Sequence, residues 1–582
     1  MYICTHDVYR DISTPTFINM NSKLCCVVAL GTALALSSCG KKLGQFSSDY
    51  FTVNPNPLEL VGQNVPAQVT AKVPAKFFVK NAEVTVTPYL VYGDGQEVAS
   101  QSYSFQGEKV RGNAPVISYE YGGTATIPAN FAYTPAMAQS ELQLGFTVQQ
   151  GKKKYVLPRV TVANGVIATA ALADAAGVNP ALAPDAFQRI INEKYAADIM
   201  FLINRANIRA DQLKTDAMAE LRKEILATRG DSTLQLEELN IKSYASPDGT
   251  MEFNTRLAQD RENTTKSYLE GQLKKDKITE FGELTAQFTP EDWEGFQQLV
   301  AKSNIQDKAL ILSVLSTVKD PEQREREIRN LSNVFEELAE QILPQLRYSR
   351  ITASVNVIGK SDEEIARLAA TDPKALSVEE ILYAATLTDD NAKRMQIYDQ
   401  AVRLYPNDYR TWNDLGMTQY IARDYDAAKA SFDRAAQLAG KGSEPAMNLG
   451  LIEMLNGDYA KANTLFGSAA GVDALGDALG VYYLKTGDNA AAVRAFGDSR
   501  TNNAALAQIL TKDYSKAKQT LASINTPDAT TYYLMAVLGA RTNNESMLNT
   551  NLRQAIRLDS KLADAARRDL EFKGFNLSRA LN

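Results

Sequence analysis

The strongest constraint on the fold is an internal repeat in the last third of the chain. Gly416 is followed 34 residues later by Gly450, and Phe432 is followed at the same interval by Phe466. A unit of this length has room for two short helices, and it buries its apolar face only by stacking on its neighbours. The sequence therefore predicts an all-α array of helix pairs over residues 375–582.

Other residues of these units strengthen the pattern. Trp412 begins the best-preserved unit, and Ala428 recurs as Ala462. The period and the residue types resemble those of tetratricopeptide repeats, and we count about five units, the later ones degenerate. The resemblance implies a concave face that binds peptides or partner proteins. The alternative is a superhelix with a purely structural role.

The positions of cysteine and histidine exclude most catalytic chemistry. All four cysteines and the only histidine, His6, lie within the first 39 residues. If that region is removed up to Cys39, the mature chain has no histidine and a single cysteine. Disulfides, Cys/His zinc sites and histidine-based triads are then excluded. We predict no enzyme, no catalytic residue, no metal and no cofactor, although a carboxylate-only active site or a calcium site stays formally open.

Charge and hydropathy exclude two further classes of protein. The net charge of -6 does not suit a nucleic-acid reader held by bulk positive charge. After residue 40 no apolar run reaches the roughly 18 residues that a transmembrane helix requires. Attachment to a membrane would therefore have to come from the N-terminus.

The N-terminal segment has the features of an export signal. A short basic stretch at residues 20–23 precedes an apolar stretch at 24–36, which is too short to span a bilayer. It ends in LSSCG at positions 36–40, which resembles the lipobox of bacterial lipoproteins. The resemblance implies cleavage before Cys39 and lipid attachment to its sulfur, and several acyl chains anchor a protein stably.

The extent of the signal depends on the start codon. Asp7 and Asp11 do not suit the basic beginning of a signal peptide. We therefore predict a signal peptide within residues 1–38 with translation starting at Met20, followed by a lipid-anchored linker at 39–47.

The next region is predicted to be a β-sandwich. Residues 84–92 are β-branched and aromatic, and Gly93-Asp94-Gly95 follows as a turn. A second hairpin is predicted to turn at residues 150–152. Short strands with regular turns over residues 48–162 favour a sandwich. The alanine-rich residues 163–186 are interpreted as a linker.

From residue 187 to 360 the pattern changes to alternating strands and helices. Strands are expected at 199–203 and 239–244, and helices at 216–228 and 254–269. This order implies a mixed sheet packed under helices.

A family resemblance rests on the second strand and helix. Gly249, Asn254, Leu257 and Arg261 stand in the register of the OmpA-like domain that binds peptidoglycan. The chain departs from the family where the acidic residue of its Gly-His-Thr-Asp motif is replaced by Ser246. In the family, that acid and the arginine hold the diaminopimelate residue of the peptide stem.

The resemblance implies a peptidoglycan-binding site made by Asp248, Gly249, Asn254 and Arg261. A guanidinium receives a carboxylate in a bidentate fork, so Arg261 would take the carboxylate of diaminopimelate. Asp248 would pair with its ammonium in place of the missing acid. The alternative is that Asp248 and Gly249 only make a turn, with Arg261 a solvated helix residue.

The α/β region is also interrupted. A candidate last strand at 350–358 comes only after a predicted helical insert at about 275–346. The motifs Thr289-Pro290-Glu291-Asp292 and Asp320-Pro321-Glu322-Gln323 are expected to cap helices within it. Such an insert resembles those of OmpA-like lipoproteins of the Bacteroidetes.

These observations predict a multidomain, non-catalytic scaffold of the cell outer membrane. It would consist of an N-terminal β-sandwich, an α/β OmpA-like domain and a C-terminal tetratricopeptide superhelix. Its predicted partners are the membrane through the lipid, peptidoglycan, and proteins bound on the concave face, but no nucleic acid. Gly40-Lys41-Lys42 lacks the acids that surface lipoproteins of the Bacteroidetes tend to carry, which favours the periplasmic side. The alternative is a surface-exposed subunit or assembly factor of an adhesin or secretion machine.

Overall fold

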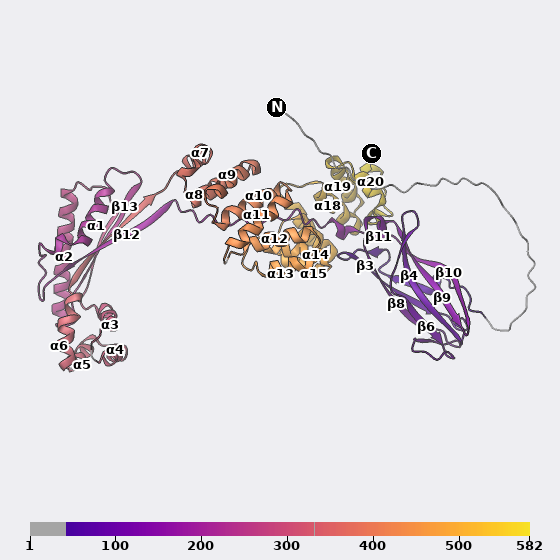
Figure 1. The fold of residues 1–582 in the computed structure, drawn as a ribbon, viewed down its shortest axis with the longest axis horizontal. Coiled ribbons are helices and arrows are strands. Elements are labelled where there is room, and N and C mark those ends of the chain that lie inside the picture. The colour runs from indigo at the N-terminus through magenta and orange to yellow at the C-terminus, as the bar shows by residue number, and fades with distance from the viewer. Residues whose placement is uncertain (1–41, 306, 331, 441, 582) are drawn as a thin grey trace, which may run out of the picture. The chain divides into compact units, whose positions relative to one another are not determined.

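The computed structural model describes residues 42–581 apart from 306, 331 and 441. The predicted signal peptide and Cys39 lie outside the described residues. The chain divides into two compact units. The first contains the residues up to Leu60, Asn64–Ala168 and Arg568–Leu570, and the second contains Val61–Gln63, Thr169–Arg567 and Glu571–Asn582. In Figure 1 the colour runs by residue number, from indigo at the N-terminus to yellow at the C-terminus.

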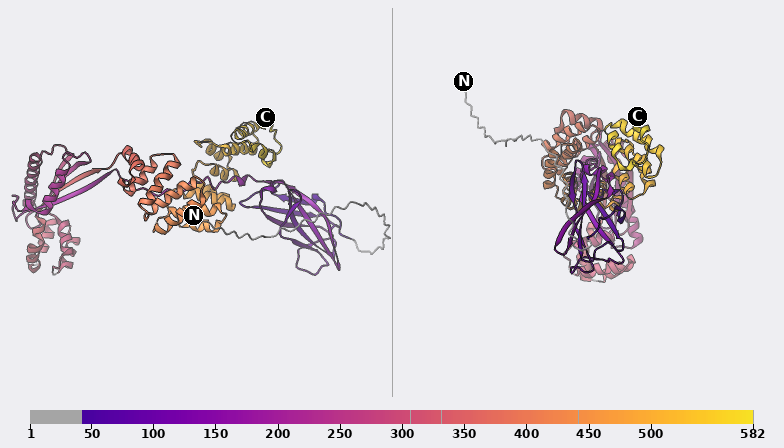
Figure 2. Two further views of the ribbon diagram at one scale, coloured as in Figure 1. Left: turned by 45° about the horizontal axis from the view of Figure 1, so that its top comes forward. Right: turned by 90° about the vertical axis from the view of Figure 1, so that its right-hand side faces the viewer.

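The first unit is built from β-strands. One sheet has the order β1-β3-β8, and a larger one has the order β10-β9-β4-β6-β7 with β5 on the side of β4. The remaining pair, β2 and β11, is parallel. The strands are β1 Phe51–Asn54, β2 Leu58–Glu59, β3 Asn64–Val73, β4 Ala82–Tyr92, β5 Gln96–Ala99, β6 Tyr103–Gly107, β7 Val116–Ile117, β8 Gly123–Ala132, β9 Ser140–Gln150, β10 Lys153–Asn164 and β11 Val166–Ile167. Figure 2 shows these indigo and purple strands from two further sides.

Alternating burial explains why these strands form layers. In β3 and β9 nearly every second side chain is buried, as the alternation of apolar and polar residues predicts. The apolar faces of the two sheets meet where the ring of Phe51 from β1 lies 5.9 Å from that of Phe146 from β9. Lys153 pairs with Gln150 across the hairpin turn predicted there, and Gly151 has the positive φ that the turn needs. The predicted strand-rich N-terminal region is confirmed.

The second unit begins its regular structure with a four-stranded mixed sheet. Its order is β12-β15-β13-β14, in which β13 runs parallel to β14 and antiparallel to β15. The elements are β12 Ile190–Met200, α1 Asp216–Ala227, β13 Leu234–Tyr244, α2 Met251–Lys275, β14 Glu283–Thr289 and β15 Tyr348–Ile358. Buried residues of both helices, such as Ile225 and Leu269, pack on Leu239 and Ile351 of the sheet. The first strand ends at Met200, so the prediction of a strand at 199–203 places it too late.

One strand was missed because it was assigned to the helical insert. We expected helix from about residue 275, but residues 283–289 form β14 along the free edge of β13. Leu284, Ala286 and Phe288 alternate with polar residues, and this period of two fits a strand. The run is short, and its pairing partner lies about 45 residues earlier in the chain, which local reading of a sequence does not reveal.

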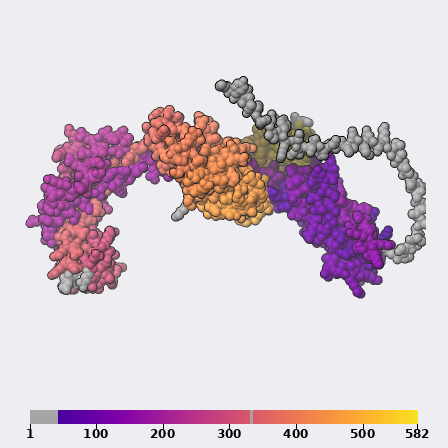
Figure 3. All heavy atoms as spheres, viewed as in Figure 1, coloured from indigo at the N-terminus to yellow at the C-terminus, as the bar shows by residue number. Residues whose placement is uncertain are grey.

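The insert itself is a small helical bundle. It contains α3 Trp293–Lys302, α4 Lys308–Thr317, α5 Pro321–Arg329 and α6 Ser332–Gln341. Asp320 caps α5 through Gln323 N–H, as predicted. The cap of α3 is Asp292, which accepts from Gly295 N–H, whereas Thr289 at the head of the predicted motif is the last residue of β14. The helices share a core that includes Phe296 and Leu338. In Figure 3 the insert is the rounded pink body next to the magenta strands and helices.

The rest of the second unit consists of stacked helices and confirms the predicted helical repeats. Helices α8 to α19 form consecutive pairs, each packed against the next. The bounds are α7 Asp362–Thr371, α8 Val378–Thr386, α9 Asn391–Leu404, α10 Tyr409–Ile421, α11 Tyr425–Leu438, α12 Glu444–Leu455, α13 Tyr459–Gly467, α14 Leu475–Thr486, α15 Asn489–Phe496, α16 Asn502–Leu510, α17 Tyr514–Ala522, α18 Ala529–Arg541, α19 Glu545–Leu558, α20 Leu562–Arg568 and α21 Ser578–Leu581. The helical region begins at Asp362, earlier than the expected residue 375.

The repeated glycines bring the two helices of a pair together. A Cβ at Gly450 of α12 would stand only 2.5 Å from the ring of Phe466 on α13. The same relation joins Gly416 to Phe432 one repeat earlier. The 34-residue period therefore reflects one repeated contact, in which an aromatic ring on one helix packs against a glycine on the other.

We expect Gly450→Ala to destabilise the repeat region by about 1–3 kcal/mol, because the added methyl overlaps the buried ring of Phe466. Gly467→Ala is the matched control. Nothing lies within 4 Å of a Cβ at Gly467, so this change should be neutral or stabilising by up to about 1 kcal/mol. The midpoint of thermal unfolding, followed by helical circular dichroism, measures both. Equal shifts for the two variants would contradict the assigned packing.

Candidate functional site

The described residues offer little support for membrane insertion or for metal chemistry. Nowhere within 42–581, the three omitted positions aside, is a helix long and apolar enough to cross a bilayer. In the same part of the chain, no group of three or more histidine, cysteine, aspartate or glutamate side chains is placed to hold a metal ion. Two places in the described residues are candidate sites: the predicted wall-binding residues and the surface of the helix pairs.

The predicted wall-binding residues do come together. Asp248 and Gly249 lie in the loop between β13 and α2, and Asn254 and Arg261 lie on α2. Thr250 caps the helix through Phe253 N–H, which sets the position of its first turn. The amide of Asn254 donates to the carbonyl of Gly249 at 3.0 Å. All of these residues gather where β13 ends.

Arg261 is not a solvated helix residue, so that part of the alternative is wrong, whereas Asp248 and Gly249 do lie in a turn, as it expected. Its side chain is fully buried at 0% exposure. Its guanidinium donates to the carbonyl oxygens of Tyr244 at 2.7 Å and Arg205 at 3.0 Å, and a longer bond of 3.3 Å reaches Leu202. Burial, together with the positive charge of Arg347, lowers the pKa of Arg261 to about 10. The group remains a cation at neutral pH, and its hydrogen bonds go to the chain's own backbone.

Asp248 also has partners within the chain. Its carboxylate accepts from the guanidinium of Arg347 at 2.8 Å and from the hydroxyl of Ser246 at 2.8 Å. Arg347 donates in addition to Ser246 at 3.1 Å. Arg347 stands just before β15, at the end of the insert. The position that the resemblance reserves for a ligand ammonium beside Asp248 is thus taken by a guanidinium of the same chain.

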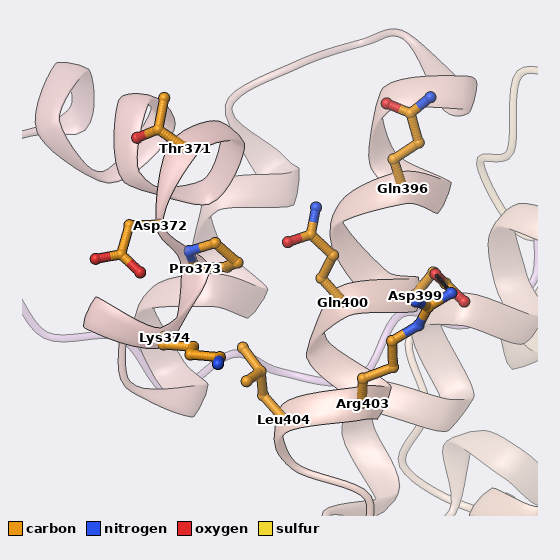
Figure 4. A pocket seen from close by; sticks show the side chains of 9 residues that line it. All are labelled: Thr371, Asp372, Pro373, Lys374, Gln396, Asp399, Gln400, Arg403 and Leu404. Carbon is orange, nitrogen blue, oxygen red and sulfur yellow. Dashed lines mark ion pairs between the residues drawn. The ribbon is translucent and has the colours of Figure 1, made fainter.

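A surface pocket lies where the helix pairs begin. Figure 4 shows it between the end of α7 and the face of α9. Its volume is about 660 Å³. It is lined by Thr371, Asp372, Pro373, Lys374, Gln396, Asp399, Gln400, Arg403 and Leu404. The Arg403 guanidinium is paired with the Asp399 carboxylate at 2.8 Å. The polar lining has no cluster that suggests a reaction.

The surface of the helix pairs carries an unexpected peptide. Residues 163–186 were interpreted as a linker, but residues 173–185, called here the docked segment, lie along the first helices of successive pairs. Ala173, Ala175, Val178 and Ala181 belong to the same apolar core as the helix pairs. The structure assigns no helix or strand between residues 173 and 187. The first helices of the pairs therefore already hold a peptide from the same chain.

Two asparagines hold the backbone of the docked segment in the same way. Asn448 of α12 accepts from the N–H of Ala181 at 2.6 Å and donates to its carbonyl at 2.9 Å. Asn503 of α16 does the same with Asp174, at 2.8 Å for each bond. One carboxamide thus satisfies both polar groups of one peptide residue. This arrangement recognises the main chain and not the side chains.

Helix α10 holds the other end of the segment. Asn413 donates to the Ala181 carbonyl at 2.9 Å, and Asp414 accepts from the N–H of Ala183 at 2.9 Å. Arg410 donates to the carbonyl of Asp185 at 2.9 Å. We call Asn413, Asp414, Asn448 and Asn503 the clamp residues. Because Ala181 and Ala183 meet α10 and α12 while Asp174 meets α16, the segment runs opposite to the order of the helices.

The clamp carboxylate is in an unusual state. Asp414 is almost completely buried, and this loss of water raises its pKa from 3.8 to about 8. The hydrogen bonds from Ala183 and Asn413 oppose that shift only in part. At neutral pH a protonated Asp414 carboxyl still accepts the N–H of Ala183 through its carbonyl oxygen.

Sequence reasoning missed the clamp residues, although the chain holds a signal for them. Asp414 and Asn448 each stand two residues before a repeated glycine, Gly416 and Gly450. Asn448 is also a polar residue within the apolar run of α12, where it is completely buried. Buried amides need partners, but the sequence does not say that the partner is a segment about 270 residues earlier.

Comparisons with known proteins find solved structures that resemble this chain at low sequence identity and low TM-score. No family model and no curated protein sequence matches the chain. A solved structure of the APC/C hetero-tetramer Cut9-Hcn1 matches with 18% identity and a TM-score of 0.32, over 38% of this chain and 46% of that one. A tetratricopeptide repeat protein from Parabacteroides merdae matches with 11% identity and a TM-score of 0.28, over 38% and 91%. Yeast Tom70 matches with 12% identity and a TM-score of 0.25, over 61% and 78%.

This chain thus spans less than half of the first of these structures. The values are low, and the assignment of a tetratricopeptide-like repeat rests on the helix pairs of the chain itself.

Arg261→Ala should lower the stability of the α/β region by roughly 3 kcal/mol or more, because it leaves buried carbonyls without a donor and opens a cavity. The control is Arg256→Ala on the same helix, whose exposed pair with Glu252 contributes little. Thermal unfolding and protease resistance measure both variants. If Arg261→Ala leaves unfolding unchanged but removes binding to peptidoglycan, the guanidinium serves a ligand instead of the fold.

Asp414→Asn should stabilise the protein at neutral pH and flatten its dependence on pH. Between pH 3.8 and about 8 the folded protein holds a proton on Asp414 that the unfolded chain has released. Stability therefore falls as pH rises through this window, on the order of 1 kcal/mol per pH unit. Asparagine keeps the acceptor without this linkage. The exposed Asp433→Asn is the charge-matched control. Parallel pH profiles of the melting temperature for wild type and Asp414→Asn would contradict the protonated carboxyl.

Proposed function

We propose that the chain is a non-catalytic scaffold of the bacterial outer membrane that is anchored by lipid and holds protein partners through its helix pairs. The observation that carries this proposal is the clamp itself. Buried amides on the first helices of successive pairs bind a peptide backbone. Such an arrangement suits the binding of a peptide and not its cleavage or modification. The distribution of cysteine and histidine along the sequence supports a role without catalysis.

The anchor rests on the sequence. The LSSCG motif at positions 36–40 directly follows an apolar stretch of signal-peptide length. Cys39 lies outside the described residues, so its lipidation stays a proposal. The outer membrane and its periplasmic side are proposed on the same basis, with Lys41 and Lys42 in place of acids.

Tethering to peptidoglycan is a second proposal, and the geometry makes it the weaker one. Its support is the gathering of Asp248, Asn254 and Arg261 at the end of β13. Against it stand the internal partners of these groups. The pair between Arg347 and Asp248 would have to open before an ammonium reached that carboxylate, and the side chains of the pair are only 10% and 16% exposed. Separating such a pair carries a large cost.

The alternative function is a surface-exposed subunit or assembly factor of an adhesin or secretion machine. It shares the anchor and the helix pairs with the first proposal and differs only in the side of the membrane. Digestion of intact cells with an added protease separates the two, since only a surface-exposed chain is cleaved.

Cys39→Ala should release the protein from membranes, because no other predicted anchor remains. Cell fractionation and labelling with palmitate measure this, and Cys26→Ala within the signal region is the control that should stay anchored. The released protein should also stay in the supernatant when it is mixed with diaminopimelate-type sacculi. Pelleting with sacculi that is lost on Asp248→Ala would instead favour the wall tether. Membrane retention of Cys39→Ala would contradict the anchor.

A further inference from the structure

The docked segment has the character of a ligand. Its polar contacts with the helix pairs come mainly from its backbone, as in the paired bonds of Asn448 with Ala181 and of Asn503 with Asp174. The hydroxyl of Tyr420 adds a bond to the carbonyl of Ala175 at 3.1 Å. Side chains of the segment contribute little beyond filling space. A core element of a fold is more often specified by the shape of its own side chains.

Four buried positions of the segment carry alanine, and two of its exposed positions lie between them. Ala173 and Ala175 are buried, whereas Asp174 between them is exposed. Ala181 and Ala183 are buried, whereas Leu182 between them is 45% exposed. The exposed positions accept an acid or a large apolar residue. Val178 and Pro180 are buried as well, so the buried positions do not follow a strict alternation. Recognition therefore requires small residues at positions 173, 175, 181 and 183 and a free N–H and C=O at the clamped positions.

The segment has a strong advantage over any competitor. It is joined to the β-strand unit at one end and to β12 at the other, so it is always near the clamp residues. A short flexible tether corresponds to an effective concentration on the order of millimolar. A peptide of equal intrinsic affinity from another molecule would have to reach that concentration to compete. Release of the segment would remove this barrier.

We propose that the clamp face is a binding site for a peptide strand with small side chains at the positions that Ala173, Ala175, Ala181 and Ala183 occupy, and that residues 173–185 are its resident, exchangeable ligand. The inference rests on the proposed scaffold function and names its partner class: a protein that offers an alanine- and proline-rich strand similar to this segment. While the segment is docked, the site is closed to that partner. Displacement of the segment opens it and frees the chain between the β-strand unit and β12.

The test uses the full-length Cys39→Ala protein and a fluorescent peptide with the sequence of residues 171–187. Ala181→Glu/Ala183→Glu places charge and bulk at two buried positions and should undock the segment. This variant should bind the peptide at least 100-fold more tightly than the protein with an unaltered segment. Leu182→Glu changes the exposed residue between them, so it should leave the segment docked and the peptide unbound. Fluorescence anisotropy measures all three proteins.

The clamp residues provide the second arm. Adding Asn448→Ala and Asn503→Ala to the undocked variant should weaken peptide binding at least tenfold, because each amide makes two bonds to the peptide backbone. Adding Asn551→Ala in α19 instead is the control: it truncates an asparagine whose amide bonds only within its own helix. An undocked variant that keeps its helical circular dichroism but binds no peptide would overturn the proposal.

If the undocked variant fails to fold, hydrogen exchange of the protein with an unaltered segment tests the proposal instead. The amides of Asp174, Ala181 and Ala183 should exchange by local opening, faster than the helix amide of Leu506 in the core. If they exchange only together with the core, the segment is an integral part of the fold and the proposal is wrong. Neither readout depends on Cys39 or on a cellular partner, so a failure here leaves the anchor and scaffold proposals standing.

Discussion

The second unit depends on the pairing of buried amides with a peptide backbone. Asn413, Asn448 and Asn503 are buried side chains of the helix pairs, and an unpaired buried amide costs about 1–3 kcal/mol. The docked segment avoids that cost because its N–H and C=O groups form hydrogen bonds with these amides. Each side satisfies the polar groups of the other, so the helix pairs and the segment make a joint core.

Through this pairing, residues 173–185 pack on helices that come more than 200 residues later in the chain. The segment that leads from the β-strand unit runs back along the helix pairs before the α/β region begins at β12. In sequence, the α/β region is therefore an insertion between a peptide and the helices that hold it. If the segment exchanges as proposed, conditions that weaken the clamp would shift it toward the undocked state. The raised pKa of Asp414 makes pH one such condition.

The same principle governs the predicted wall-binding residues. Arg261, Asp248 and Asn254 were singled out through the resemblance to the OmpA-like domain, and the structure does bring them together at the end of β13. What the spacing did not reveal is that Arg347 pairs with Asp248 and that backbone carbonyls surround Arg261. A charge in the interior needs a partner, and here that partner belongs to the chain. The resemblance identified a neighbourhood of residues, whereas their contacts decide what they bind.

The sequence by itself determined the features that depend on local periodicity and local chemistry. The 34-residue recurrence revealed the helix pairs because each pair repeats one contact between a glycine and an aromatic ring, and alternation revealed the strands of the first unit. The capping residue Asp320 marked a helix start because a cap bonds within its own turn. Only the tertiary structure decided the place of β14, the burial of Arg261 and the docking of residues 173–185. Those outcomes depend on which distant group satisfies a polar atom or a sheet edge, and neither composition nor spacing encodes that choice.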